Sequence, residues 1–310
     1  MIDNCGQIPV APPDFKSGFI GLIGRPNVGK STLMNQLVGE KVAITSPVAQ
    51  TTRDRLRGIL TTDSAQMIFV DTPGIHKPHH ELGKVIVKNA QSTIEAVDVI
   101  LLVVDGSSPS GGGDRYIVNL LKKTTVPVLV GINKSDLVSD EKKAKNHATY
   151  QELLGEQPWE LVQFSALTGA GLDLLQEKLI ASLELGPYYY PPGLVSDQPE
   201  RLVMAELIRE QILRETREEI PHSVAIIIDQ VIAEKNLTTI RATINVERTS
   251  QKGILIGKKG AMLKRIGTAA RTEMQKLIAG KVYLELFVRV QAKWRDSPRQ
   301  VAEFGYFQEN

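Results

Sequence analysis

Residues 24–32 read Gly-Arg-Pro-Asn-Val-Gly-Lys-Ser-Thr and match the phosphate-loop pattern G-x-x-x-x-G-K-[ST] without a mismatch. An apolar run at 19–23 comes before this loop, and apolar residues at helical spacing follow it, which predicts a strand, a loop and a helix in that order. In that setting the backbone N–H groups of the loop and the positive end of the helix converge on phosphate oxygens. A glycine-rich turn without a ligand is the alternative, and residues elsewhere in the chain have to distinguish the two.

The phosphate loop assigns chemical roles to its own side chains. We expect Lys30 to reach the β- and γ-phosphates of a nucleotide, and the Ser31 hydroxyl to help hold Mg²⁺. The loop residues expected to contact the nucleotide are Gly24, Asn27, Val28, Gly29, Lys30, Ser31 and Thr32.

Length and composition limit what else the chain can be. With 310 residues, of which 42% are apolar and 23% charged, it has the size of two ordinary globular domains. No run approaches eighteen apolar residues, and residues 1–16 lack the apolar segment of a secretory signal. The single cysteine, Cys5, has no partner for an internal disulfide. We therefore expect a cytoplasmic protein in a reducing compartment.

Hydrophobic patterning divides the chain into four segments. Residues 1–17 read as an N-terminal extension, and residues 18–183 alternate strands with helices, which predicts an α/β domain with a doubly wound, mostly parallel sheet. Residues 184–199 form a proline-containing linker, and residues 200–310 read as an α+β domain. The linker tyrosines, Tyr188–Tyr190, are either a binding platform or a surface packed against an adjoining domain, and we favour packing.

The pattern also predicts individual elements. In the first domain, buried strands are expected at 19–23, 67–70, 99–104 and 126–132. Residues 55–62 are expected to form a hairpin with 66–71. In the second domain, strands are expected at 223–233, 238–246 and 282–290. Helices are predicted over 31–39, 83–96, 114–123, 141–153, 171–183, 201–218, 260–279 and 298–304.

A second motif, Asp71-Thr72-Pro73-Gly74, follows a predicted strand at the sheet edge where an open α/β domain binds its ligand. Asp71 is placed to act on Mg²⁺ through water, and the Gly74 N–H is placed to meet a γ-phosphate. A plain β-turn explains these four residues equally well when they are taken alone.

Two further motifs indicate which base the nucleotide carries. Asn133-Lys134-Ser135-Asp136 follows a predicted strand, and the Asp136 carboxylate can accept the N1–H and N2 amino donors that guanine presents on one edge. Adenine has no such pair of donors. Ser165-Ala166-Leu167 follows another strand, and the Ala166 N–H is placed to donate to the guanine O6. We therefore expect GTP or GDP, with guanine-end contacts from Asn133, Lys134, Asp136, Ser165, Ala166 and Leu167.

These four segments resemble the nucleotide-contacting elements of translation-factor-class GTPases, which have a Ras-like P-loop NTPase fold. Residues 50–55, Gln-Thr-Thr-Arg-Asp-Arg, resemble the first switch of the Era and TrmE branch. The resemblance implies a threonine that closes on Mg²⁺ and the γ-phosphate, and we favour Thr52 over Thr51. The Mg²⁺ residues it implies are Ser31, Thr52 and Asp71. The catalytic residues it implies are Asn27, Lys30, Thr52 and Gly74.

The position after the second motif departs from the Ras-like pattern. Ile75 stands where a glutamine would orient the attacking water, so we expect slow GTP hydrolysis unless another group takes that role. GTPases of this branch that have an asparagine at the position of Asn27 can recruit K⁺, so the resemblance implies K⁺-stimulated hydrolysis. Three nearby histidines lack a cysteine or fixed carboxylate partner, and we interpret them as solvated rather than metal-binding: His76, His79 and His80.

Positive charge gathers near the end of the chain. Residues 248–299 hold 13 Lys or Arg against 3 Asp or Glu, which is typical of nucleic-acid binding and also of a solvated face. Within this stretch, Gly257-Lys258-Lys259-Gly260 forms a G-x-x-G loop between two helical segments. A helix, a hairpin, this loop, a helix and a third strand resemble a type II KH domain, whose loop lets an RNA backbone approach closely. A plain helix–helix turn is the alternative for the loop alone.

The basic residues of this domain are expected at RNA phosphates. Ile254 and Ile256 are expected to floor the groove for the bases, although core packing explains them equally well. The expected RNA-binding residues are Lys252, Ile254, Ile256, Gly257, Lys258, Lys259, Gly260, Lys264 and Arg265. We interpret Trp294 as packing the last helix against the sheet, with stacking on a base as the alternative.

A GTPase domain, a stiff linker and a KH domain together resemble the KH-containing GTPases of small ribosomal subunit assembly. The resemblance implies GTP hydrolysis, binding near the 3′ end of 16S ribosomal RNA, and release of the RNA after hydrolysis. It also implies a weak peripheral contact with the inner face of the cell membrane, and we expect a monomer. Two other classes stay open: a P-loop ATPase with a basic accessory domain, and a GTPase signalling switch with a protein effector.

Overall fold

The computed structural model describes residues 8–45, 56–74, 81, 88, 92–216 and 220–306. The chain divides into two compact units, and the main change of unit lies between Asp197 and Gln198, within the expected linker. None of the described helices is long and apolar enough to cross a membrane.

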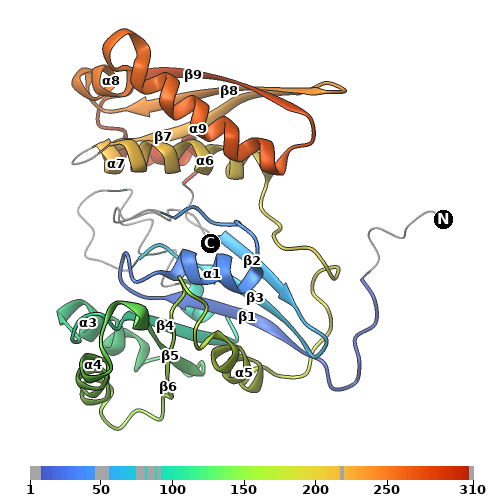
Figure 1. Ribbon diagram of the computed structural model, residues 1–310, viewed down its shortest axis with the longest axis vertical. Helices are drawn as coiled ribbons and strands as arrows, with labels where there is room; N and C mark the ends of the chain where they lie inside the picture. Colours follow the sequence, from blue (N-terminus) through green and yellow to red (C-terminus); the bar gives the residue numbers. More distant parts are fainter. Residues whose placement is uncertain are drawn as a thin grey trace. The chain divides into compact units, whose positions relative to one another are not determined.

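The first unit is built on a six-stranded sheet with the order β2-β3-β1-β4-β5-β6 (Figure 1). Its strands are β1 (Lys16–Ile23), β2 (Leu56–Thr61), β3 (Ala65–Asp71), β4 (Val99–Asp105), β5 (Val128–Asn133) and β6 (Leu161–Gln163). All neighbouring strands are parallel except β2 and β3, which form the antiparallel hairpin expected from the sequence. The predicted α/β fold with a mostly parallel sheet is confirmed.

Helices cover both faces of this sheet. The described helices are α1 (Lys30–Val38), α3 (Gly112–Leu121), α4 (Asp140–Leu154) and α5 (Leu172–Ser182), with a short 3₁₀ turn, η1 (Ser135–Leu137). Alternate residues of β4, such as Leu102, pack with Ile117 of α3 and Tyr150 of α4. The intervening residues point to the other face, where Figure 1 shows α1 and α5. Burial on both faces explains why these strands are almost wholly apolar. The helix predicted over 83–96 lies mostly outside the described residues.

The chain that follows α5 packs along the first unit. Tyr188 lies against the buried ring of Phe15, with ring centroids 4.3 Å apart. The N–H groups of Tyr189 and Tyr190 donate to the side-chain oxygen of buried Gln66 at 2.8 and 3.0 Å. The packing interpretation is therefore confirmed for Tyr188, whereas Tyr189 is 43% exposed. Phe15 is buried and β1 begins at Lys16, so the first domain already starts within residues 1–17, which were expected to be an extension.

The last residues of the first unit are fastened to the edge strand β2. The Ile59 N–H donates to the Val195 carbonyl at 2.9 Å, and the Ser196 hydroxyl donates to the Arg57 carbonyl at 2.8 Å. The Arg57 guanidinium also contacts the Asp197 carboxylate at 2.9 Å. Two hydrogen bonds and one ion pair therefore hold residues 195–197 to β2.

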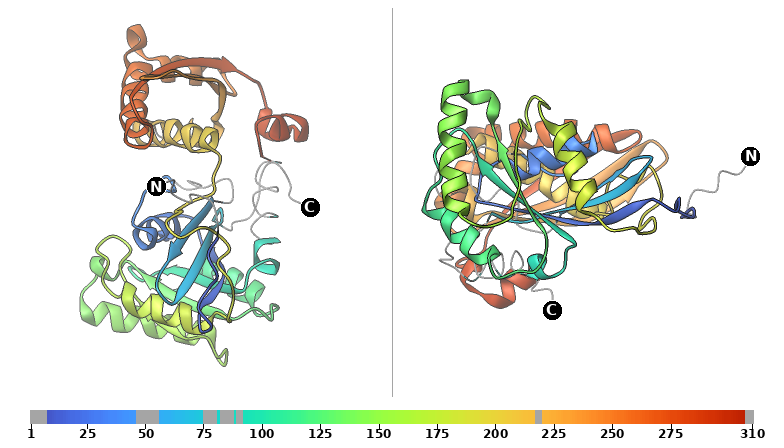
Figure 2. Two further views of the ribbon diagram at one scale, coloured as in Figure 1. Left: turned by 90° about the vertical axis from the view of Figure 1, so that its right-hand side faces the viewer. Right: turned by 90° about the horizontal axis from the view of Figure 1, so that it is seen from below.

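The second unit has a three-stranded sheet with two long helices on one face (Figure 2). β7 (Ala225–Ala233) and β8 (Leu237–Val246) are antiparallel, and β9 (Lys281–Val290) runs parallel to β8. The helices are α6 (Glu200–Glu215), α7 (Ile220–Ser223), α8 (Thr249–Ile256), α9 (Ala261–Leu277) and α10 (Pro298–Glu303), with 3₁₀ turns η2 (Lys258–Gly260) and η3 (Trp294–Asp296). The long helices and the three strands follow the order expected for the second domain. The short helix α7 was not predicted, and it contains Ser223, which was expected to begin the strand that starts at Ala225.

One apolar core holds the second unit together. Ile212 of α6, Ile266 of α9 and Ile244 of β8 are all fully buried within it. Trp294 is also 0% exposed, and its indole N–H donates to the Ser223 carbonyl at 2.9 Å. A fully buried ring has no free face for a base, so the packing interpretation of Trp294 is confirmed.

Candidate functional site

The phosphate loop joins the end of β1 to α1. Gly29, the residue before α1, has a φ of 99°, in the left-handed region that favours glycine. The buried Lys30 ammonium donates to the carbonyls of Gly24 at 3.3 Å and Arg25 at 3.1 Å. Burial lowers the pKa of Lys30, and the nearby Asp71 carboxylate opposes that shift. A buried cation held by carbonyl oxygens is well suited to bind an anion.

Ser31 and Asp71 bring the phosphate loop and the second motif together. The Ser31 hydroxyl donates to Asp71 Oδ2 at 2.5 Å, and Asp71 is fully buried at the end of β3. Gly74 passes so close to the phosphate loop that a Cβ there would lie 2.5 Å from the Pro26 nitrogen. A hydroxyl and a carboxylate are the oxygen ligands that Mg²⁺ prefers, so this pair fits a magnesium ion next to the phosphates.

Asn133 links three of the four motifs. Its side-chain amide donates to the Val28 carbonyl at 2.8 Å, and its side-chain oxygen accepts the N–H groups of Lys134 at 2.7 Å and Ala166 at 2.9 Å. The Ala166 N–H, expected at the guanine O6, therefore donates within the protein in this structure. Because β1, β4, β5 and β6 lie side by side and run parallel, the ends of β5 and β6 lie at the same edge of the sheet as the phosphate loop that follows β1.

The guanine end of the site is open. The Ser165 hydroxyl donates to Asp136 Oδ1 at 2.6 Å, which orients the carboxylate expected to read guanine. Asp136 and Leu167 are exposed, and Thr32 is half-buried in the first turn of α1. Several expected positions lie outside the described residues, namely Thr51, Thr52, Ile75, His76, His79 and His80.

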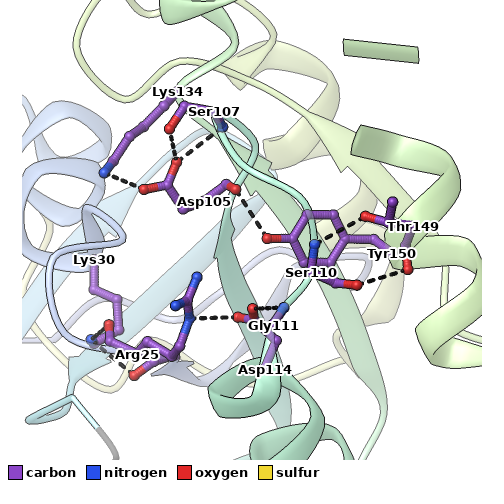
Figure 3. A network of polar contacts seen from close by, with 11 residues as sticks. Arg25, Lys30, Asp105, Ser107, Ser110, Gly111, Asp114, Lys134, Thr149 and Tyr150 are labelled. Atoms are coloured by element: carbon purple, nitrogen blue, oxygen red, sulfur yellow. Dashed lines mark hydrogen bonds and ion pairs between the residues drawn. The ribbon is translucent and has the colours of Figure 1, made fainter. Parts of the chain in front are cut away.

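Asp105, at the end of β4, is a site residue that the sequence analysis missed (Figure 3). Its carboxylate contacts the Lys134 ammonium at 2.6 Å and accepts the Ser107 hydroxyl at 2.5 Å. Partial burial pushes the pKa of Asp105 upward, but the hydrogen bonds from Lys134 and Ser107 outweigh it and hold the pKa below its usual value. Asp105 therefore fixes the lysine of the third motif. The sequence did contain the pattern that predicts this residue, because Asp105 ends an apolar strand just as Asp71 and Asn133 do.

The G-x-x-G loop of the second unit is built from unusual backbone conformations. Gly257, Lys259 and Gly260 have φ values of 70°, 52° and 79°. A side chain at Gly257 would also meet Met262, whose nitrogen would lie 2.9 Å from the added Cβ. The loop thus turns tightly between α8 and α9, and it presents the exposed side chains of Lys258 and Lys259.

A hollow of about 530 Å³ begins at this loop and lies between α9 and β9. Its α9 side has a basic, open surface, and its β9 side is mostly apolar. The lining residues are Gly260, Leu263, Lys264, Gly267, Thr268, Arg271, Tyr283, Leu284, Glu285 and Leu286. A Cβ at Gly267 would lie 3.3 Å from Leu286 Cδ1, so glycine there lets helix and strand approach closely. The sequence analysis missed Arg271 and Tyr283, although Gly260, Lys264, Gly267 and Arg271 recur at helical spacing.

The remaining expected RNA-binding residues take different positions. Lys264 is exposed on the rim of the hollow, and Lys252 is half-buried in α8. Arg265 is exposed but pairs with the Glu215 carboxylate at 2.5 Å. Ile254 is 52% exposed and Ile256 is half-buried, and neither is among the residues that line the hollow.

Comparisons with known proteins agree with this geometry. Residues 19–134 match the family described as 50S ribosome-binding GTPase, and residues 219–295 match the KH domain family. The chain is 66% identical to the GTPase Era of Rippkaea orientalis over 303 residues, covering 98% of this chain and 96% of that protein. It is also 66% identical to the GTPase Era of Nostoc sp. over 300 residues, covering 97% of this chain and 92% of that protein.

Two solved structures share both domains. The chain is 40% identical to a point variant of Aquifex aeolicus Era bound to GDP.AlF4⁻, with a TM-score of 0.90, covering 94% of this chain and 99% of that one. The same identity and coverage, with a TM-score of 0.91, relate it to Era in complex with MgGDPNP and nucleotides 1506–1542 of 16S ribosomal RNA. A GTPase domain and a KH domain are thus both matched, and the similarity to the Era proteins extends over nearly the whole chain. The chain therefore belongs to the Era family of GTPases.

Proposed function

We propose that this GTPase is a switch that binds 16S ribosomal RNA near its 3′ end and acts in assembly of the small ribosomal subunit. The hollow between α9 and β9 carries the proposal, because it combines the last glycine of the G-x-x-G loop, the basic side chains of Lys264 and Arg271, and an aromatic side chain, Tyr283. Single-stranded RNA is bound by this combination, with phosphates at the basic loop and bases stacked on aromatic or apolar surface. The Era relative of 40% identity that was solved with nucleotides 1506–1542 of 16S ribosomal RNA supports this partner.

Binding of a 16S 3′-end RNA fragment tests the proposal. The double variant Lys258→Glu/Lys259→Glu should weaken RNA binding strongly and reduce the slope of log affinity against log salt by about one for each phosphate that a lysine no longer neutralises. Lys122→Glu/Lys123→Glu is the matched control, because these adjacent lysines are exposed and lie in the first unit. Equal RNA affinity in both double variants would contradict the proposal and favour a protein effector instead.

Magnesium is the metal that the phosphate site fits. We propose that the Ser31 hydroxyl binds Mg²⁺ directly, that Asp71 acts on it through water, and that Thr52 joins when GTP is bound. Bound next to the nucleotide, the ion would neutralise charge that develops on the phosphate oxygens. The chain itself contributes the Lys30 ammonium and the backbone N–H groups of the loop, which would hold the phosphates in place. Ser31→Ala should raise the Mg²⁺ concentration needed for half-maximal hydrolysis, whereas an unchanged requirement would remove Ser31 from the metal site.

We also propose that K⁺ stimulates hydrolysis at Asn27. Asn27 is exposed within the phosphate loop and has a φ of 63°, in the left-handed region that asparagine tolerates better than most residues. A monovalent cation there would stabilise transition-state charge in the absence of a water-orienting glutamine at position 75. Turnover should be several-fold faster in K⁺ than in Na⁺ buffer, and Asn27→Ala should abolish the difference. Equal turnover in the two buffers would refute the K⁺ proposal and leave the GTPase assignment intact.

We propose that β2 transmits the conformational difference between the GTP-bound and GDP-bound states to the RNA-binding domain. This strand directly follows the expected first switch, and through Arg57 and Ile59 it contacts residues 195–197, which we call the connector. We propose that closure of the switch on GTP shifts β2 and thereby the connector. Identical domain orientation in the GDP and GTP-analogue states, measured by distances between spin labels, would refute this relay.

We place the protein in the cytoplasm, where its proposed RNA partner resides. The peripheral membrane contact implied by the family resemblance would be an additional property. Cosedimentation with vesicles that match the cell's inner membrane lipids tests it.

A further inference from the structure

Arg25, the second residue of the phosphate loop, is tied to a helix far along the chain. Its Nε lies 2.8 Å from Asp114 Oδ1, although 89 positions separate the two residues (Figure 3). Asp114 stands in the first turn of α3 and is 2% exposed, while the Arg25 side chain is 32% exposed. Neither residue belongs to the nucleotide contacts expected from the four motifs.

The surroundings fix both partners of this ion pair. Asp114 Oδ2 accepts the N–H of Gly111 at 2.9 Å, so the carboxylate is oriented by the start of its own helix. The stem of the arginine runs over the same first turn of α3, where a Cβ at Gly113 would lie 2.6 Å from Arg25 Cδ. Gly113, which has no side chain, therefore leaves the space in which the arginine lies.

The peptide anchored in this way is the one that receives Lys30. The Arg25 carbonyl accepts the Lys30 ammonium at 3.1 Å. The adjoining residue, Pro26, is the point where Gly74 comes closest to the phosphate loop, since a Cβ at Gly74 would lie 2.5 Å from the Pro26 nitrogen. Residues 25 and 26 thus form the contact between three parts: α3, the lysine of the phosphate loop, and the loop expected to meet the γ-phosphate.

We propose that Arg25 and Asp114 are a positioning pair for the GTPase reaction, which holds the phosphate loop so that Lys30 and Gly74 meet the γ-phosphate in the correct geometry. The Arg25 guanidinium contacts Asp114 of α3, so the pair would act on the reaction through the loop backbone. Hydrolysis depends on positioning of the reacting groups to within a fraction of an ångström, so loss of this tie should slow the chemical step more than it weakens GDP binding. The pair adds α3 to the parts of the chain that set the reaction geometry.

Single-turnover hydrolysis at saturating GTP and Mg²⁺ tests the proposal. Asp114→Asn and Arg25→Gln should each lower this rate by about tenfold or more, while the GDP dissociation constant changes by less than about threefold, because GDP has no γ-phosphate to be positioned. The double variant should be no slower than the slower single variant, since two residues that act as a unit are non-additive. Glu160→Gln, which breaks the exposed Lys178–Glu160 pair of the same unit, is the matched control and should hydrolyse GTP normally.

The alternative is that the pair only stabilises the fold. In that case Asp114→Asn would lower the unfolding temperature, and the folded fraction would hydrolyse GTP at the normal rate, which would overturn the proposal. A slow Arg25→Gln variant beside a normal Asp114→Asn variant would also overturn it, because Arg25 would then act on the nucleotide itself.

Gly113→Ala replaces Asp114→Asn as the test if Asp114→Asn fails to fold. The added methyl suits a helix but displaces the arginine, so hydrolysis should slow without a lower unfolding temperature; normal hydrolysis by Gly113→Ala would again overturn the proposal.

Discussion

Asn133→Ala is expected to damage both the stability and the nucleotide site of this protein. The Asn133 side chain makes three hydrogen bonds, to the Val28 carbonyl and to the N–H groups of Lys134 and Ala166. These partners belong to three separate motifs. Alanine removes all three bonds and leaves a small void at a position that is 2% exposed.

The magnitude follows from the groups left behind. Val28 and Ala166 are buried, so their carbonyl and N–H lose a partner without gaining water. Each such group costs about 1–3 kcal/mol, and the two together should lower the free energy of unfolding by about 2–6 kcal/mol. In the variant the loops that Asn133 joins are no longer held together, so GDP binding has to order them. We therefore expect the GDP dissociation constant to rise about 10- to 100-fold, at 1.4 kcal/mol for each factor of ten.

Asn35→Ala is the matched control. Asn35 also makes three side-chain hydrogen bonds to the backbone, at the Ala43 carbonyl and at the N–H groups of Val42 and Ala43, and none of these partners belongs to the four motifs. Denaturant unfolding without nucleotide should show a loss of stability in both variants. Titration with a fluorescent GDP analogue should show weaker binding in Asn133→Ala alone. Equal GDP affinity in the two variants would refute the bridging role of Asn133.

Three further predictions follow from other contacts. Gly29→Ala forces a φ of 99° on alanine and places its Cβ 2.3 Å from Asn133 Nδ2, so nucleotide binding should weaken. In the control Gly39→Ala, alanine takes a φ of 81° but meets no neighbouring atom. Thermal melting of this control should show only the cost of backbone strain, a loss of about 1–3 kcal/mol in the free energy of unfolding. Asp136→Asn should shift competition binding from guanosine toward xanthosine diphosphate, and unchanged preference would reopen the ATPase alternative. Arg57→Ala should reduce the difference in RNA affinity between the GTP-analogue and GDP states, while Lys178→Ala, which breaks an exposed pair elsewhere in the same unit, should not.

Contiguous motifs made much of the nucleotide site predictable. Asp71 and Asn133 each follow an apolar run directly, and parallel strands place such residues at one edge of a sheet whatever the loops between them do. The same reasoning applied to Asp105 would have added it to the site. The order of elements in the second unit was predictable for a similar reason, since the periods of its strands and helices differ clearly.

Long-range side-chain pairs were not predictable. The tie between Arg25 and Asp114 depends on how α3 packs against the sheet, and nothing in either local sequence specifies the other partner. Exposure was also hard to predict, because Ile254 and Leu255 are both apolar neighbours on α8, yet the first is 52% exposed and the second fully buried. Which face of a short helix is buried depends on the helices and strands that follow it in the sequence and pack against it.

The dependence of RNA affinity on the bound nucleotide tests the central claim most directly. The dissociation constant for a 16S 3′-end RNA fragment should be measured with the protein saturated with GDP and with a non-hydrolysable GTP analogue, at one salt concentration. We predict tighter binding in the GTP-analogue state, and loss of that binding in Lys258→Glu/Lys259→Glu. Equal affinity in the two nucleotide states would contradict the proposal that this GTPase is an RNA-binding switch.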